Sequence, residues 1–141
     1  MTESFKETDQ QPFVIDFKEL VMENDSYRKV IWTGNHIQAL IMSIPENEEA
    51  GTEVHHNIDQ YTRIEDGQGV CRMGPSPDEF TYERAITTND AIFIPGNMWH
   101  NIINTGGRPL KLYTIYSIPE YAEGTIHHTR EDASGHTLLS E

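Results

Sequence analysis

The sequence predicts an all-β sandwich or barrel, and three observations support this fold class. About eight or nine short runs of β-branched, aromatic and other apolar residues recur at intervals of roughly 8 to 12 residues. Gly, Pro, Asn and Asp residues separate these runs and supply the turns between strands. Helical periodicity is nearly absent, so we expect little helix.

The length of 141 residues suits one domain with a substantial core. Residues 1–12 are polar and predict a flexible N-terminus. The strand-rich region spans residues 13–120, and we expect residues 121–141 to form a tail that packs on it.

The first elements precede an acidic loop. Residues 12–16 alternate briefly and predict a short strand, with one helical turn after Asp16. Residues 29–33 and 36–44 flank a Gly34-Asn35 turn and predict a hairpin. Both faces of the second hairpin strand are apolar, which indicates a strand inside a sandwich.

The other strand-like runs follow the same pattern of apolar residues ended by turn residues. They are residues 60–65, 69–73, 80–86, 91–94, 100–104 and 110–118.

Charge and composition exclude several kinds of partner. Ten basic against 23 acidic residues give a net charge of −13, which would repel phosphate backbones and anionic lipid heads, so we expect neither nucleic-acid nor membrane binding. The absence of a signal-peptide pattern predicts a cytoplasmic protein. The single cysteine, Cys71, lies in an apolar-leaning run and is interpreted as a buried strand residue rather than a reactive thiol.

Two stretches carry side chains that can bind a metal. In an extended backbone Glu53 and His55 project from one face, and Val54 and His56 from the other. Gln60 then opens the next strand, which ends at a turn.

In the second stretch the apolar run of residues 91–94 is stopped by Pro95-Gly96-Asn97, and His100 starts the following strand. A metal needs donors that converge on one point, and inward-facing positions on neighbouring strands of a small barrel supply them.

These stretches resemble the two sequence motifs of the cupin superfamily, across about the middle third of the chain. In the first motif, Glu53 and His55 stand where the family has two histidines, and Gln60 stands where it has glutamate. In the second motif, His100 takes the place of the histidine, and Asn97 stands where the family has glycine. Asn104 matches the last position of that motif.

The resemblance implies a double-stranded β-helix, or jelly-roll, barrel with one divalent metal ion inside. Its ligands would be Glu53, His55, Gln60 and His100. Mn, Fe, Ni, Co and Zn all suit such donors. A three-residue spacer would make His56 the ligand in place of His55, but only His55 shares a face with Glu53. A site without metal stays open, because Gln60 is neutral.

The resemblance also implies a small-molecule ligand in the barrel. The expected activity is that of a metal-dependent enzyme, isomerase-like or epimerase-like as in the mannose-6-phosphate isomerase group, or dioxygenase-like. Two alternatives are a ligand-binding or sensing protein without turnover and a purely structural polar cluster. Glu53, His56 and His127 are the candidates for proton transfer. Dimers are frequent in the family, so we expect a homodimer.

The tail carries two further features. His127 and His128 are adjacent and would point to opposite faces of a strand, so they cannot easily bind one ion together. We expect surface positions for both, with a role at the barrel rim as the alternative. Thr129 precedes Asp132 by three residues, the spacing of a helix capping box.

Overall fold

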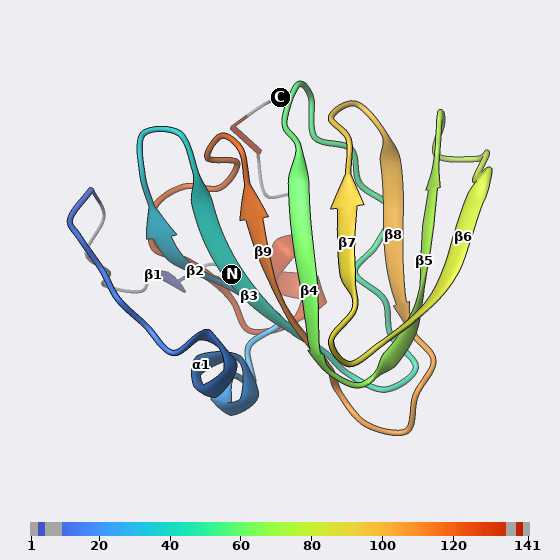
Figure 1. The fold of residues 1–141 in the computed structure, drawn as a ribbon, viewed down its shortest axis with the longest axis horizontal. Helices are drawn as coiled ribbons and strands as arrows, with labels where there is room; N and C mark the ends of the chain where they lie inside the picture. Colours follow the sequence, from blue (N-terminus) through green and yellow to red (C-terminus); the bar gives the residue numbers. More distant parts are fainter. Residues whose placement is uncertain (1–2, 5–9, 135–137, 140–141) are drawn as a thin grey trace.

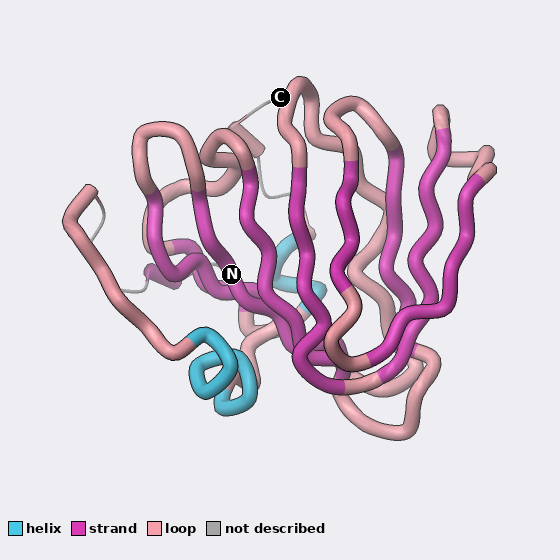
Figure 2. The backbone as a smooth tube through the Cα atoms, in the orientation of Figure 1, coloured by secondary structure: helices cyan, strands magenta, loops and turns pink. Residues whose placement is uncertain are grey.

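The structure of the protein is a computed structural model that describes residues 3–4, 10–134 and 138–139. Its elements, in chain order, are β1 (Glu3–Ser4), α1 (Phe17–Glu23), β2 (Arg28–Thr33), β3 (Gln38–Ile44), β4 (Gln60–Asp66), β5 (Gln68–Gly74), β6 (Tyr82–Thr87), β7 (Ala91–Ile94), β8 (Trp99–Asn104), β9 (Leu110–Tyr116), β10 (Thr125–His127) and α2 (Arg130–Ala133). Strands make up most of the described elements, and the two helices are short (Figure 2). The all-β prediction is therefore confirmed.

The strands form two antiparallel sheets (Figure 1). The larger sheet has the order β1-β10-β2-β3-β9-β4-β7, and the smaller one has the order β6-β5-β8. In the connection between β3 and β4, isolated bridges join Glu49 to Ile103 and Glu53 to His100, so this segment lies along β8. The two sequence stretches that carry the candidate donors are thus neighbours in space.

The main core lies between the sheets. Its fully buried members include Ile44, Ile64, Leu110 and Leu112, which come from β3, β4 and β9. A second, smaller cluster of Val21, Ile31 and Ile41 joins α1 to the other face of the larger sheet. Strand β3 is buried at all seven positions, because one face contacts each cluster.

The hairpin of β2 and β3 and the six later strands appear where the sequence predicts them, with boundaries that differ by a few residues. The strand predicted at residues 12–16 is wrong, since this segment has no regular structure. Asp16 instead caps α1 by accepting a hydrogen bond from the Glu19 amide, and the helix runs for seven residues rather than one turn.

The described residues near the two ends of the chain can also be compared with the structure predicted from the sequence. Glu3–Ser4 pairs with β10 as a strand that the sequence pattern does not predict, while residues 1–2 and 5–9 of the predicted flexible segment lie outside the described residues. At the other end, Thr129 and Asp132 form the expected capping box at the start of α2. No helix in the described ranges is long and apolar enough to cross a membrane.

Cys71 is buried in β5, as predicted. Burial raises the pKa of its thiol to about 11, because the thiolate would lose hydration inside the core. The side chain therefore behaves as a small apolar residue.

Asn104, the last residue of the second motif, joins the loop after β3 to the loop between β8 and β9. Its buried Nδ2 donates to the backbone oxygens of Ile44, Pro45 and Arg108 at 2.9, 3.1 and 3.0 Å, and its Oδ1 accepts from the Gly106 amide at 2.9 Å. Replacing Asn104 by alanine leaves these backbone groups without the side chain that satisfies them.

We expect Asn104→Ala to lower the free energy of unfolding in urea by about 2–3 kcal/mol. The matched control is Thr105→Ala, because Thr105 is the exposed neighbour and should change stability by less than about 0.5 kcal/mol. An Asn104→Ala protein as stable as this control would show that the loops do not depend on the side chain.

Candidate metal centre

His55 is one of two buried imidazoles at the centre of the candidate site, and only 2% of it is exposed. Its Nδ1 lies 2.5 Å from Oε2 of Glu120, a carboxylate that is fully buried. Because a carboxylate accepts, Nδ1 carries the proton and Nε2 carries the lone pair. Nε2 is buried and makes no hydrogen bond within the described part of the chain. This is the arrangement in which a histidine binds metal through Nε2.

His100 on β8 is the second buried imidazole, and its ring centroid lies 5.3 Å from that of His55. Its Nδ1–H donates to the backbone oxygen of Met98 at 3.0 Å, which again leaves Nε2 with a lone pair. Burial lowers the pKa of His100 below its usual 6.5, and His55 adds to this, against the opposing effects of the Met98 carbonyl and Glu53. At neutral pH His100 is therefore the uncharged imidazole that can act as a ligand.

Gln60 is buried at the start of β4. Its Nε2 donates to the hydroxyl of Thr62 at 3.0 Å, and that hydroxyl lies 2.7 Å from the hydroxyl of Thr114 on β9. The threonine pair thereby orients the amide. Its Oε1 is buried and has no hydrogen-bond partner among the described residues.

Glu53 is held differently from the other candidate ligands. Its backbone forms a β-bridge with His100, with two hydrogen bonds of 2.9 Å. Its carboxylate contacts Nη2 of Arg28 at 3.5 Å and the hydroxyl of Tyr121 at 3.2 Å. Among the described residues no three His, Cys, Asp or Glu side chains are grouped so that they could hold a metal. The structure thus brings His55 and His100 together without the Glu53 carboxylate as a third member.

A pair of asparagines fixes the two histidine segments against each other. Asn57 and Asn97 both adopt positive φ, 59° and 68°, a conformation that asparagine tolerates better than most residues. The Asn57 amide donates to Oδ1 of Asn97 at 3.0 Å, and the Asn97 amide donates to the backbone oxygen of His55 at 3.0 Å. Asn97, which stands where the cupin motif has glycine, therefore adopts a positive φ and adds a side-chain link between the motifs.

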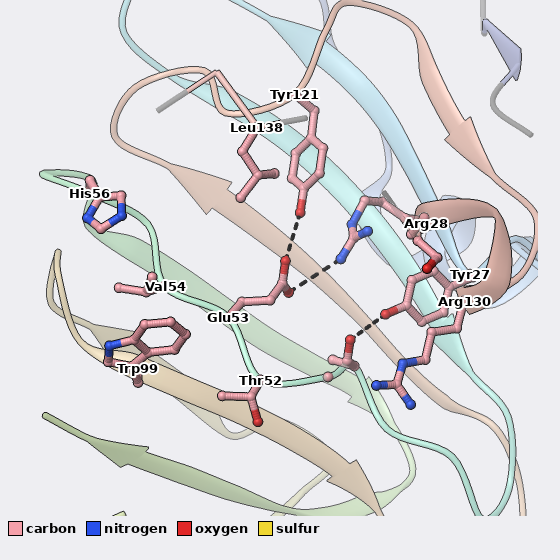
Figure 3. A pocket seen from close by; sticks show the side chains of 14 residues that line it. Tyr27, Arg28, Thr52, Glu53, Val54, His56, Trp99, Tyr121, Arg130 and Leu138 are labelled. Carbon is pink, nitrogen blue, oxygen red and sulfur yellow. Dashed lines mark hydrogen bonds and ion pairs between the residues drawn. The ribbon is translucent and has the colours of Figure 1, made fainter. Parts of the chain in front are cut away.

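A cavity of about 530 Å³ opens beside Glu53 (Figure 3). Its described lining is Tyr27, Arg28, Ala50, Gly51, Thr52, Glu53, Val54, His56, Trp99, Tyr121, Arg130, Ala133, Ser134 and Leu138. His56, the alternative ligand, is exposed and lines this cavity. The described lining does not include His55 or His100. Glu53 lines the cavity and also joins His100 through its backbone.

The surface position predicted for His127 is wrong. Its side chain is fully buried, Nδ1 lies 3.4 Å from Nη1 of Arg28, and its ring packs edge-on against Tyr121 with centroids 6.4 Å apart. The cause is that β10 pairs with β1 on one side and β2 on the other, which places it inside the sheet. His128, which points the other way, is exposed as predicted.

Three residues of the site were not predicted from the sequence. Glu120 contacts His55 across 65 positions of sequence, and Arg28 contacts Glu53 across 25. Gln38 holds the segment that carries Glu120, through hydrogen bonds from the Glu120 and Tyr121 amides to its Oε1 at 2.9 and 3.0 Å. The one available signal is that Gln38 is a polar residue in a strand that is otherwise almost entirely apolar.

Two antiparallel sheets that enclose a core, with buried histidines from two separate motifs, define a protein of the double-stranded β-helix class. The chain belongs to the cupin family, since the family model described as "Cupin domain" matches residues 40–116, more than half of the sequence.

Similar proteins carry the same domain. The chain is 43% identical over 123 residues to the uncharacterized protein YrkC of Bacillus subtilis, covering 87% of this chain and 66% of YrkC, slightly less than two thirds of its length. It is 36% identical to the uncharacterized protein L612 of Acanthamoeba polyphaga mimivirus, over 89% of this chain and 77% of that protein. The crystal structure of BH2720 from Bacillus halodurans has a TM-score of 0.86 and 41% identity, covering 87% and 93% of the two chains. These similarities support the fold and the family without naming an activity.

Proposed function

We propose that this cupin binds one divalent metal ion through His55 and His100, with Gln60 as a third donor, and a small molecule in the adjacent cavity. The observation that carries the proposal is the paired buried imidazoles. Each has its Nδ1–H committed to an oxygen of the protein, which leaves both Nε2 atoms as acceptors. Cupins often bind metals, which agrees with this donor set.

The residues present fit a metal ion. Nε2 of His55 and Oε1 of Gln60 are both buried without a hydrogen-bond partner in the described structure, and a buried acceptor of this kind is costly unless something binds it. Glu120 behind His55 supplies the carboxylate that commonly orients a ligating histidine and makes it a stronger donor. The position of His55 also favours it over the exposed His56 as the ligand.

The donors give the proposed site a particular character. Two imidazole nitrogens and an amide oxygen bring no negative charge, while the Glu53 carboxylate is engaged by Arg28 and Tyr121. Mn, Fe, Ni, Co and Zn are all compatible with nitrogen and oxygen donors of this kind. Lewis-acid polarisation of a carbonyl or hydroxyl oxygen is the chemistry that such an ion supplies when bound.

For an enzymatic role, this chain's own residues supply the proton transfer. Glu53 and His56 both line the cavity, where a bound molecule would meet them. Arg28 and Tyr121 orient the Glu53 carboxylate, which makes Glu53 the better positioned of the two candidates for a general base. His127 contacts Arg28 instead, and is better described as a residue that positions it.

Elemental analysis of protein purified without a histidine tag tests the metal proposal. We expect about one ion per chain in the unmodified protein, and less than about a tenth of that in His55→Ala and in His100→Ala, because each variant leaves too few donors for tight binding. Added metal should also raise the melting temperature of the unmodified protein and not that of these variants.

The matched controls are His56→Ala and His128→Ala, since both side chains are exposed and neither belongs to the proposed donor set. Both variants should keep the ion. Metal retained by His55→Ala and His100→Ala alike would overturn the proposed site. Circular dichroism of each variant separates loss of the ligand from loss of the fold.

A further inference from the structure

Arg28 lines the cavity, although the residue is only 3% exposed. A guanidinium has five N–H donors, and burial makes each unfilled donor costly. Nη2 reaches Glu53 at 3.5 Å and Nη1 reaches His127 at 3.4 Å, both long for charge-assisted hydrogen bonds. Nε has no hydrogen-bond partner among the described residues. Tyr27 also makes a side-chain hydrogen bond with Arg28. The unpaired Nε and the two long contacts still leave Arg28 with donor capacity that the described residues do not fill.

Two aromatic rings hold this guanidinium in place. Its carbon lies 5.0 Å from the ring centroid of Tyr27 and 4.7 Å from that of Tyr121, within the range of cation–π contacts. The hydroxyls of both tyrosines are in turn tied to the protein, that of Tyr27 to the Ala50 oxygen at 2.5 Å and that of Tyr121 to Glu53 at 3.2 Å. A fixed, planar cation of this kind loses little entropy when it binds a carboxylate.

The charge around the cavity is opposite to that of the whole chain. Arg28 and Arg130 line it, and Glu53 is the one acidic residue in its described lining, whereas the chain carries a net charge of −13. Arg130 is about half exposed, and its contact with Glu49 is 3.8 Å, so it adds positive charge at the opening. A locally positive cavity with low-dielectric walls concentrates anions.

The other side of the cavity carries the apolar side chains of Trp99 and Val54, next to His56. Figure 3 shows Arg28, Tyr27 and Arg130 on one side of Glu53, and Trp99 and Val54 on the other. A volume of about 530 Å³ is in the usual range for small-molecule sites. The cavity thus offers a cationic end and an apolar end to a single ligand.

We propose that the cavity binds a small carboxylate with an apolar body, with the carboxylate accepting hydrogen bonds from Arg28 and the body packing against Trp99 and Val54. The ligand carboxylate competes with Glu53, whose side chain is 25% exposed and whose contact with Arg28 is long. This inference rests on the proposed function in taking this cavity as the ligand site, and it names the class of ligand.

Calorimetric titration of metal-free protein with benzoate and with benzamide tests the inference, because the two probes share a ring and differ in charge. Benzoate should bind at least about tenfold more tightly than benzamide. In Arg28→Met, which keeps the length of the side chain and removes its charge, benzoate should bind at least about 30-fold more weakly. In Glu53→Gln, which removes the competing carboxylate, it should bind about three- to tenfold more tightly.

The control is Arg84→Met on β6, an exposed arginine outside the cavity lining, which should bind benzoate like the unmodified protein. Equal binding of benzoate and benzamide, or no tightening in Glu53→Gln, would overturn the inference even if Arg28→Met failed to fold. Metal-free His100→Ala should still bind benzoate. If the protein takes up metal but binds benzoate and benzamide equally, this inference alone fails. If it prefers benzoate but takes up no metal in the elemental analysis, the metal proposal alone fails.

Discussion

Replacing Gln38 by leucine is expected to lower the free energy of unfolding by at least about 3 kcal/mol, because two buried backbone amides lose their acceptor and a buried carbonyl loses its donor. Gln38 is fully buried, and its Oε1 accepts from the amides of Glu120 and Tyr121 at 2.9 and 3.0 Å. Its Nε2 donates to the Tyr121 oxygen at 2.8 Å and to the Thr33 hydroxyl at 3.0 Å. Leucine fills the space and satisfies none of these groups.

The same substitution should weaken the candidate metal site. Gln38 ties down the segment that carries Glu120, the partner of His55, and Tyr121, the partner of Glu53. We expect metal affinity to fall by about tenfold or more, since loss of an outer-shell contact typically costs this much. Urea denaturation measures the first effect and calorimetric titration with Zn²⁺ the second.

Gln68→Leu is the control for this prediction, because Gln68 is also a strand glutamine but is exposed on β5. It should change stability by less than about 0.5 kcal/mol. A Gln38→Leu protein that unfolds within about 1 kcal/mol of the unmodified chain would contradict the view that this side chain organises the 120–121 segment.

The strands were predictable from sequence because their signals are local. Alternating side chains and turn residues act over a few positions, so β4, β7, β8 and β9 lie within a few residues of their predicted ranges. The strand predicted at residues 12–16 failed for the same reason, since four or five alternating residues with no partner strand do not make a sheet edge.

The candidate site was predictable only in part. The spacing of the two motifs located His55, Gln60 and His100, and all three are buried. It could not show that Glu53 contacts Arg28 and Tyr121, because those partners are 25 and 68 positions away along the chain. A shared face limits where a side chain can point, but the nearest opposite charge decides where a carboxylate ends up.

The contacts that orient the histidines lie beyond local patterns altogether. Glu120 follows the last strand of the motif region and has no spacing that relates it to His55. The position of His127 was predicted wrongly. A histidine in a polar tail suggests a surface position, but β10 pairs with a strand on each side, and this buries the side chain. A local sequence pattern cannot identify partner residues that only the closed fold brings together.

Glu120→Gln is expected to weaken metal binding while leaving the stability of the metal-free protein nearly unchanged. The amide keeps an oxygen that can accept from Nδ1 of His55, so the tautomer of the imidazole and its Nε2 lone pair are retained. It removes the negative charge that strengthens the imidazole as a donor, and metal affinity should fall by about 10- to 100-fold. The metal-free protein should stay within about 1 kcal/mol of the unmodified chain, because loss of a buried charge offsets loss of a charged hydrogen bond. Titration with Zn²⁺ and urea denaturation of the metal-free protein measure the two quantities.

Glu123→Gln makes the same chemical change at an exposed position three residues further on, and it should alter neither quantity. If Glu120→Gln bound metal as tightly as Glu123→Gln, the carboxylate behind His55 would have no part in metal binding. If it destabilised the metal-free protein by more than about 3 kcal/mol, Glu120 would act mainly through the fold. Weaker metal binding with unchanged stability is the result that a carboxylate acting through His55 on a bound ion requires, because a purely structural role would move both quantities together.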